Sequence, residues 1–126
     1  MARELILLSH SWRASADLSS YIYYAVQLDS NGEVALANAT SETLGILQNA
    51  PDAQYEEAEV GMIGFSKAKA GGTISIFDKL APDANGKLAA TTTDGDDYVA
   101  VALEAAVEND VFQVFLVPFG VISNPS

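Results

Sequence analysis

The sequence feature that most constrains the fold is a tight turn that occurs twice. Asp29-Ser30-Asn31-Gly32 and Asp83-Ala84-Asn85-Gly86 begin 54 residues apart and have Asp, Asn and Gly at the same places. Asn-Gly favours a β-hairpin turn, because both residues tolerate the positive φ that such turns need. A strand-like segment follows each copy, at 33–37 and at 87–90. The sequence therefore predicts two hairpins at a fixed spacing, turned at Asp29, Asn31, Gly32 and at Asp83, Asn85, Gly86.

The same spacing continues beyond the turns. Residues 58–65 fall on residues 112–119, with valine over valine and phenylalanine over phenylalanine. A long period with only two copies indicates two pseudo-symmetric halves of one domain, at about 17–70 and 71–119. The alternative is that two hairpins of an all-β protein share their turn chemistry by chance.

Short runs of β-branched and aromatic residues dominate the rest of the chain. They are separated by turn signals at roughly 8–12-residue spacing, which is typical of a small β-barrel or sandwich. The expected strands are 21–28, 33–37, 44–48, 55–70, 87–90, 98–103 and 111–117, with 73–77 either a strand or a turn. Gly61 and Gly64 are expected to bend their strand, and Pro118 to end the last one. We predict an all-β fold, a small compact β-barrel or β-tulip with at most one short helix.

The chain divides into three parts. At 126 residues it has room for one domain. Residues 1–16 lie outside the repeat and are predicted to be an extended N-terminal arm, 17–119 a single β-barrel domain, and 120–126 a flexible tail. The apolar run at 5–8 could be a strand buried on both faces or an arm that packs on something else. It is shorter than the core of a signal peptide, so no export signal is expected.

Charge and composition exclude several classes of partner. The net charge is −11, with four lysines and sixteen acids after residue 16, so the body repels phosphate backbones and nucleic acid is not an expected partner. No stretch approaches the ~20 apolar residues of a membrane span, so no membrane is expected either. The chain has no cysteine, which excludes disulfides and thiolate metal sites.

The single histidine, His10, is the only residue that suggests nucleophilic catalysis. It lies in Ser9-His10-Ser11-Trp12, but a nucleophile and its base must converge in space and need a third, orienting group. We interpret His10 as solvated or part of an interface. No enzyme activity and no cofactor are predicted, and a small hydrolase stays a third hypothesis.

Acidic clusters provide the only candidate metal ligands. They are Glu56, Glu57 and Glu59, then Asp94, Asp96 and Asp97, and the two Asp-x-Asn-Gly turns. Carboxylate and amide oxygens suit Ca²⁺, but no cluster has the spacing of an EF-hand loop. The simpler interpretation is that each turn Asp accepts hydrogen bonds from its own backbone. No metal site is predicted.

Several framework segments together resemble the small capsid decoration (cement) proteins of tailed bacteriophages, of the β-barrel or β-tulip type. They cover most of residues 17–117: Asp17-Leu18-Ser19, Gly45-Ile46-Leu47-Gln48-Asn49, Val60-Gly61, Lys69-Ala70-Gly71-Gly72, Asp83-Ala84-Asn85-Gly86-Lys87, Val99-Ala100-Val101-Ala102-Leu103-Glu104-Ala105-Ala106 and Val111-Phe112-Gln113-Val114-Phe115-Leu116. The chain departs from the family in two places. It has Ala100 where the family usually has Gly, and Glu108-Asn109-Asp110 where a glycine-containing turn is common.

The resemblance implies a non-enzymatic structural protein of the virion. Such a protein binds the outer surface of an assembled capsid, often as a homotrimer, and holds neighbouring major capsid subunits together. Its partners are then the major capsid protein and itself, and its place is the outside of the virion after synthesis in the host cytoplasm.

The N-terminal arm is the expected docking element. Its apolar run could add a strand to an exposed edge on a neighbour, and Trp and Arg are enriched at binding hot spots. The expected interface residues are Arg3, Leu5, Ile6, Leu7, Leu8, Trp12 and Arg13. Deleting residues 2–13 is expected to leave a folded barrel that no longer binds capsids. The alternative function is a carbohydrate- or Ca²⁺-binding β-module on a virion or cell surface, using the acidic loops and Tyr21, Tyr23 and Tyr24.

Overall fold

A computed structural model of the chain describes residues 5–38, 43–91 and 97–121. Over these residues it contains strands and no helix, which confirms the all-β prediction. The nine strands are β1 (Leu5–Arg13), β2 (Ala25–Leu28), β3 (Val34–Leu36), β4 (Gly45–Leu47), β5 (Glu57–Lys69), β6 (Lys79–Pro82), β7 (Leu88–Ala90), β8 (Asp97–Ala102) and β9 (Val111–Val121). No helix that could cross a bilayer occurs in these three stretches.

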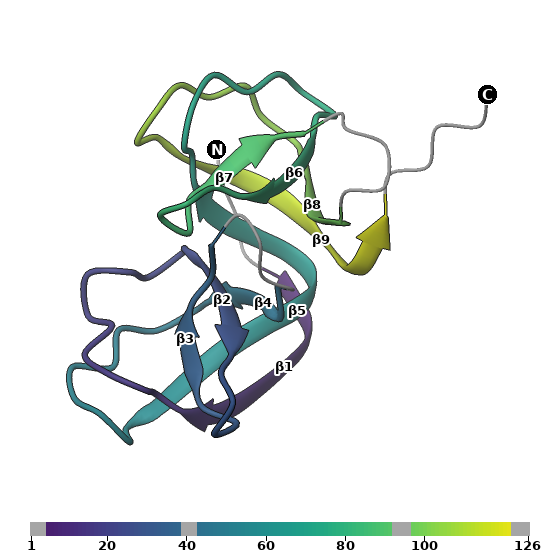
Figure 1. Cartoon of the computed structure of the whole chain (residues 1–126). Coiled ribbons are helices and arrows are strands. Elements are labelled where there is room, and N and C mark those ends of the chain that lie inside the picture. Colours follow the sequence, from purple (N-terminus) through teal and green to yellow (C-terminus); the bar gives the residue numbers. More distant parts are fainter. Residues whose placement is uncertain (1–4, 39–42, 92–96, 122–126) are drawn as a thin grey trace.

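The strands form one sheet that curls into an open half-barrel (Figure 1). Its order is β3-β2-β4-β5-β9-β8-β6-β7, and β1 also pairs with β5. Every pair of named strands is antiparallel. β3 and β7 end the order, and a single parallel bridge joins each of them to the residue that follows a long strand, Val34 to Ala14 after β1 and Leu88 to Ala70 after β5.

Two units with the same topology share β5. Strands β1–β5 make a first unit with the order β3-β2-β4-β5-β1, and strands β5–β9 make a second unit with the order β7-β6-β8-β9-β5. β5 is therefore the last strand of the first unit and the first strand of the second. The predicted halves met at residue 70, but the repeating units overlap along β5, and β1 is the first unit's counterpart of the second half of β5.

β5 is bent where it passes from one unit to the other. Gly64 has a φ of 125°, and a Cβ there would collide with the backbone of Leu5. The register with β1 shifts on either side of Leu8, so extra residues bulge out of the ladder. The glycines predicted to bend this strand thus lie at its irregular stretch.

Several strand boundaries differ from the prediction. β2 begins at Ala25, because Tyr23 has a φ of 71° and turns the chain just before it. Residues 73–77 form a turn in which Ile74 bridges to Ala106.

Pro118 does not end the last strand, because β9 continues to Val121. Tyr98 pairs with Gly120 while Ala100 pairs with Leu116, so residues 117–119 lie opposite Val99 alone. A proline costs no ladder hydrogen bond in such a bulge. Of the predicted tail, residues 120 and 121 belong to β9 and residues 122–126 lie outside the described residues.

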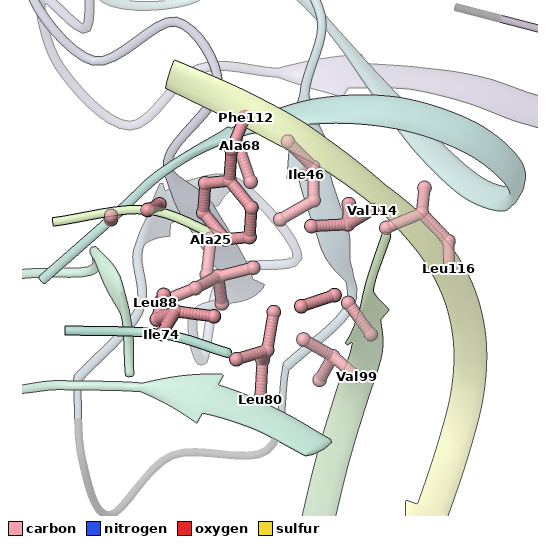
Figure 2. Packing of buried hydrophobic residues seen from close by; sticks show 14 of the residues in the cluster. Ala25, Ile46, Ala68, Ile74, Leu80, Leu88, Val99, Phe112, Val114 and Leu116 are labelled. Carbon is pink, nitrogen blue, oxygen red and sulfur yellow. The ribbon is translucent and has the colours of Figure 1, made fainter. Parts of the chain in front are cut away.

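The buried apolar residues form two clusters. The smaller belongs to the first unit and comprises Ala14, Leu18, Val26, Val34, Leu47, Ala58 and Val60. The larger comprises Ala25, Ala37, Ile46, Ala68, Ala70, Ile74, Leu80, Leu88, Val99, Ala100, Ala102, Ala106, Phe112, Val114 and Leu116. Figure 2 shows Ala25 and Ile46, from the first unit, among residues of the second. The two units therefore pack as one body.

The described part of the predicted arm lies in the sheet. Residues 5–13 are β1, Ile6 packs against the larger cluster and Trp12 against the smaller one. Ala14, directly after β1, is fully buried. A separate arm up to residue 16 stays a prediction for residues 1–4 alone, which lie outside the described part of the chain.

Candidate functional site

The first Asp-x-Asn-Gly turn is held by its own backbone. Asp29 Oδ1 accepts hydrogen bonds from the N–H groups of Asn31 at 2.9 Å and Glu33 at 3.0 Å. The N–H of Gly32 donates to the carbonyl of Asp29 at 3.0 Å, and Gly32 has a φ of 74°. The carboxylate therefore serves the turn.

The second turn repeats this arrangement. Asp83 Oδ1 accepts from the N–H groups of Asn85 at 2.8 Å and Lys87 at 3.1 Å. The N–H of Gly86 donates to the carbonyl of Asp83 at 3.2 Å, with a φ of 82° at Gly86. These residues are structural turns and offer no chemistry of their own.

The acidic clusters form no metal centre in the described stretches. No group of three or more His, Cys, Asp or Glu side chains that could hold an ion occurs there. One oxygen of Glu56 accepts a hydrogen bond from the backbone N–H of Asp52 at 3.0 Å. Asp94 and Asp96 lie outside the described residues.

His10 lies in the middle of β1 with its side chain exposed. Its ring contacts the Trp12 ring edge-to-face, with 4.6 Å between centroids. Successive side chains of a strand point to opposite faces, so those of Ser9 and Ser11 point away from His10. The geometry gives His10 an aromatic contact and no serine partner on its own strand.

The N-terminal end of β1 presents the most exposed apolar side chains of the predicted interface. Leu5, Leu7 and Leu8 are all exposed, and Leu7 is 70% exposed. Their backbone pairs with β5 of the same chain, with Leu5 opposite Phe65 and Leu8 opposite Ile63. The hypothesis that this run adds a strand to a neighbour is therefore wrong for the β1 edge that β5 occupies.

Exposed aromatic residues continue this surface across the sheet. Phe65 lies opposite Leu5 on one side and opposite Phe115 on the other, so all three side chains share a face. The two phenylalanine rings are in contact, with centroids 5.5 Å apart, and both are partly exposed. We call Leu5, Leu7, Leu8, Phe65 and Phe115 the apolar surface.

The sequence prediction found only part of this surface. It missed Phe65 and Phe115. A signal for Phe115 was present in the alternation along 111–117, because Phe112, Val114 and Leu116 are buried and Phe115 points away from them. Ile6 and Trp12 pack against the two cores. Arg13 is exposed opposite Glu57, and Arg3 lies outside the described residues.

The titration of the Asp17 carboxyl is clearly perturbed. Hydrogen bonds from Ser19, first from its hydroxyl and then from its backbone N–H at 2.9 Å, hold the pKa of the exposed Asp17 carboxyl below its usual 3.8. Hydrogen bonds to the charged form favour ionisation. These hydrogen bonds join Asp17 to Ser19 in the loop after β1.

Comparison with known proteins places the fold. No protein-family model and no curated protein matches the sequence. Among solved structures, the chain is similar to the head fiber gp8.5 N base of bacteriophage phi29, with a TM-score of 0.66 and 18% sequence identity. The similarity covers 87% of this chain and 93% of that chain. The two proteins thus share a fold over nearly their whole lengths.

Proposed function

We propose that the protein is a non-enzymatic structural component of a phage head that binds the outer surface of the assembled capsid. The observation that carries this proposal is the shared fold with a phage head fiber base over 87% of the chain. The resemblance of framework segments to capsid decoration proteins points to the same setting.

The surface of the molecule suits this role. The apolar surface is a patch of leucine and phenylalanine side chains that water solvates poorly, and such patches commonly mark sites of protein association. The net charge of −11 keeps the rest of the protein soluble and suits a position outside the capsid, away from packaged DNA.

In its finer form, the proposal is that the protein bridges neighbouring major capsid subunits as a homotrimer. Many copies on one shell gain from simultaneous contacts, so weak individual sites suffice for stable decoration. The carbohydrate- or Ca²⁺-binding alternative gains no support from the turns, whose Asp29 and Asp83 oxygens accept backbone N–H groups.

The bridging role is tested by heating undecorated, expanded phage heads with and without the protein. A protein that bridges neighbouring subunits binds only the intact shell and therefore raises its apparent stability by mass action, whereas a protein that binds single subunits equally well before and after disruption does not. We expect the temperature of head disruption to rise with protein concentration and to level off at saturation. Binding without any rise would contradict bridging, although it would leave capsid attachment in place.

A further inference from the structure

The repeat allows each position of the first unit to be matched with a position of the second. Tyr23 and Phe77, 54 residues apart, both have a φ of 71°. Tyr55 and Asn109, again 54 apart, both have a φ of 73°. The two units therefore correspond residue by residue, including at unusual backbone positions.

One face of the first unit is covered by the second. Ala25 and Ile46 are buried in the larger cluster (Figure 2). Ala37 is buried there as well, and Tyr23 packs against that cluster. We call these four residues the covered face.

Specific contacts hold the covered face. The N–H of Ala25 donates to the carbonyl of Gly86 at 2.8 Å, and the N–H of Lys69 donates to that of Tyr23 at 3.1 Å. Lys67 Nζ lies 5.7 Å from the centre of the Tyr23 ring. The contact thus combines a hairpin turn, the end of a long strand and a cation over an aromatic ring.

The matching face of the second unit is open. Its residues are Phe77, Lys79, Thr91 and Val101, and Lys79 pairs with Val101 as Ala25 pairs with Ile46. Phe77 is 73% exposed, Lys79 is exposed, and the other two are half-buried. The second unit therefore presents to solvent the face that the first unit buries. We call these four residues the open face.

We propose that a second copy of this chain covers the open face with its first unit, repeating the contact between the units. The residues that match Gly86, Lys67 and Lys69 are Gly32, Ser11 and Arg13. Two parallel bridges establish this match, Ala14 to Val34 in the first unit and Ala70 to Leu88 in the second. They align Ala14 with Ala70, so that Arg13 corresponds to Lys69 and Ser11 to Lys67.

The first unit is shaped for this role. A Cβ built on Gly32 meets no atom within 4 Å, whereas one on Gly86 meets Leu36 Cδ1 at 2.7 Å. The first turn is thus free where the second is packed.

Charge also favours a second copy as the occupant. All four lysines lie between residues 67 and 87, and Lys79 belongs to the open face. The turn that would meet it carries Asp29 and Glu33, whose carboxylates have the opposite charge to Lys79. The contact joins different surfaces of the two copies, so it either closes into a ring or extends as a chain.

The proposed function includes self-association, and this inference rests on that part of it by naming the contact between copies. The contact itself does not require the capsid. A capsid protein covering the open face is the competing occupant. It predicts that the free protein stays monomeric at every concentration.

The first test compares Phe77→Asn with Tyr55→Asn by sedimentation velocity over a concentration series. Both variants remove an exposed aromatic side chain from a left-handed position that asparagine tolerates, so both should fold. We expect wild type and Tyr55→Asn to associate with rising concentration, and Phe77→Asn to need about tenfold more protein or to stay monomeric. A monomeric wild type, or a Phe77→Asn variant that associates like wild type, would overturn the proposal.

The second test uses the absence of cysteine in the chain. Asn31 lies in the first turn, and Ala90 is the counterpart of Leu36, which the second turn approaches in the contact between the units. Asn31→Cys and Ala90→Cys variants, alone and mixed, are treated with a short bismaleimide linker. The mixed sample should give cross-linked dimers at least about tenfold faster than either variant alone, as expected for a held contact with a high effective concentration. Equal rates in all three samples would contradict the contact.

Phage heads separate this inference from the proposed function. If Phe77→Asn binds heads as wild type does, capsid attachment stands without the contact between copies. If wild type associates through the open face but binds no heads, the inference stands and the proposed function fails.

Discussion

Two exposed aromatic residues, Tyr55 and Phe77, have left-handed backbone conformations that asparagine or glycine would adopt more easily. Tyr55 is 57% exposed, so its ring gains little from packing. The chain itself has Asn109 at the matching position of the second unit, with the same φ of 73°. The repeat thus shows which residue type suits this position.

Tyr55→Asn is expected to increase the free energy of unfolding by about 0.5–1 kcal/mol, because it relieves the left-handed strain and removes little buried area. Urea denaturation of wild type and variant measures the difference. Asn109→Tyr is the reverse control and should cost more than Tyr55→Asn gains, because it also removes the hydrogen bond that Lys87 Nζ donates to Asn109 Oδ1 at 2.7 Å. A clear loss of stability in Tyr55→Asn would contradict this account.

The two turn glycines are predicted to differ although their sequences match. Gly32→Ala should cost about 1–2 kcal/mol from its positive φ alone. Gly86→Ala should cost at least about 1 kcal/mol more, because its Cβ would crowd Leu36 at 2.7 Å in the contact between the units. Denaturant unfolding of both variants tests this, provided that the dependence of the unfolding free energy on denaturant concentration is unchanged. An equal loss of stability in the two variants would show that the second turn is not packed against the first unit.

Ser19→Ala should raise the pKa of Asp17 towards its usual 3.8, because it removes the hydroxyl that stabilises the carboxylate. A lowered folded pKa contributes stability that is present above pH 3.8 and is lost as the pH falls through the folded value. Carboxyl NMR titration of both proteins measures the shift. An unchanged pKa would assign the effect to the backbone N–H alone.

At the scale of strands, hairpins and turns could be predicted from the sequence, and long-range pairing could not. The Asn-Gly turns and the strands beside them have local signals, since φ and hydrogen bonds within five residues decide them. β1 has no turn near its partner β5, which follows more than 40 residues later. It therefore resembled a separate arm. The prediction that Pro118 ends the last strand was wrong for a similar reason, because the bulge that accommodates this proline depends on the register of β9 with β8.

Because β1 belongs to the sheet, the structure changes the expectation for removing it. Deleting residues 2–13 strips β5 of a strand and uncovers the smaller cluster, against which Trp12 packs. We expect the first unit to lose its cooperative unfolding transition and hydrogen-exchange protection to fall around Val26 and Val34. Trp12→Ala is the milder variant and should lower stability by about 1–3 kcal/mol. A truncated protein with unchanged protection would restore the view of residues 2–13 as a docking arm only.

At the scale of the whole molecule, the repeat explains why one end of the protein is closed and the other open. The second unit covers the first, and nothing within the described residues matches that contact on the open face. The sequence predicted the two halves from their shared turns. It could not show which face of each half is buried. The residue types at the matched positions, Ala25 and Lys79 or Ile46 and Val101, depend on how the two units pack, and no local signal predicts that packing.

The apolar surface supplies the most direct test of capsid binding at this scale. Purified protein is sedimented with expanded, undecorated phage heads, with unexpanded shells as the control. Wild type is compared with a Leu7→Ser/Leu8→Ser variant and with Leu28→Ser, which removes an exposed leucine outside the apolar surface. We predict saturable co-sedimentation of wild type and Leu28→Ser with expanded heads only, and at least about tenfold weaker binding of the double variant. Failure of the wild-type protein to bind expanded heads would contradict the proposed function.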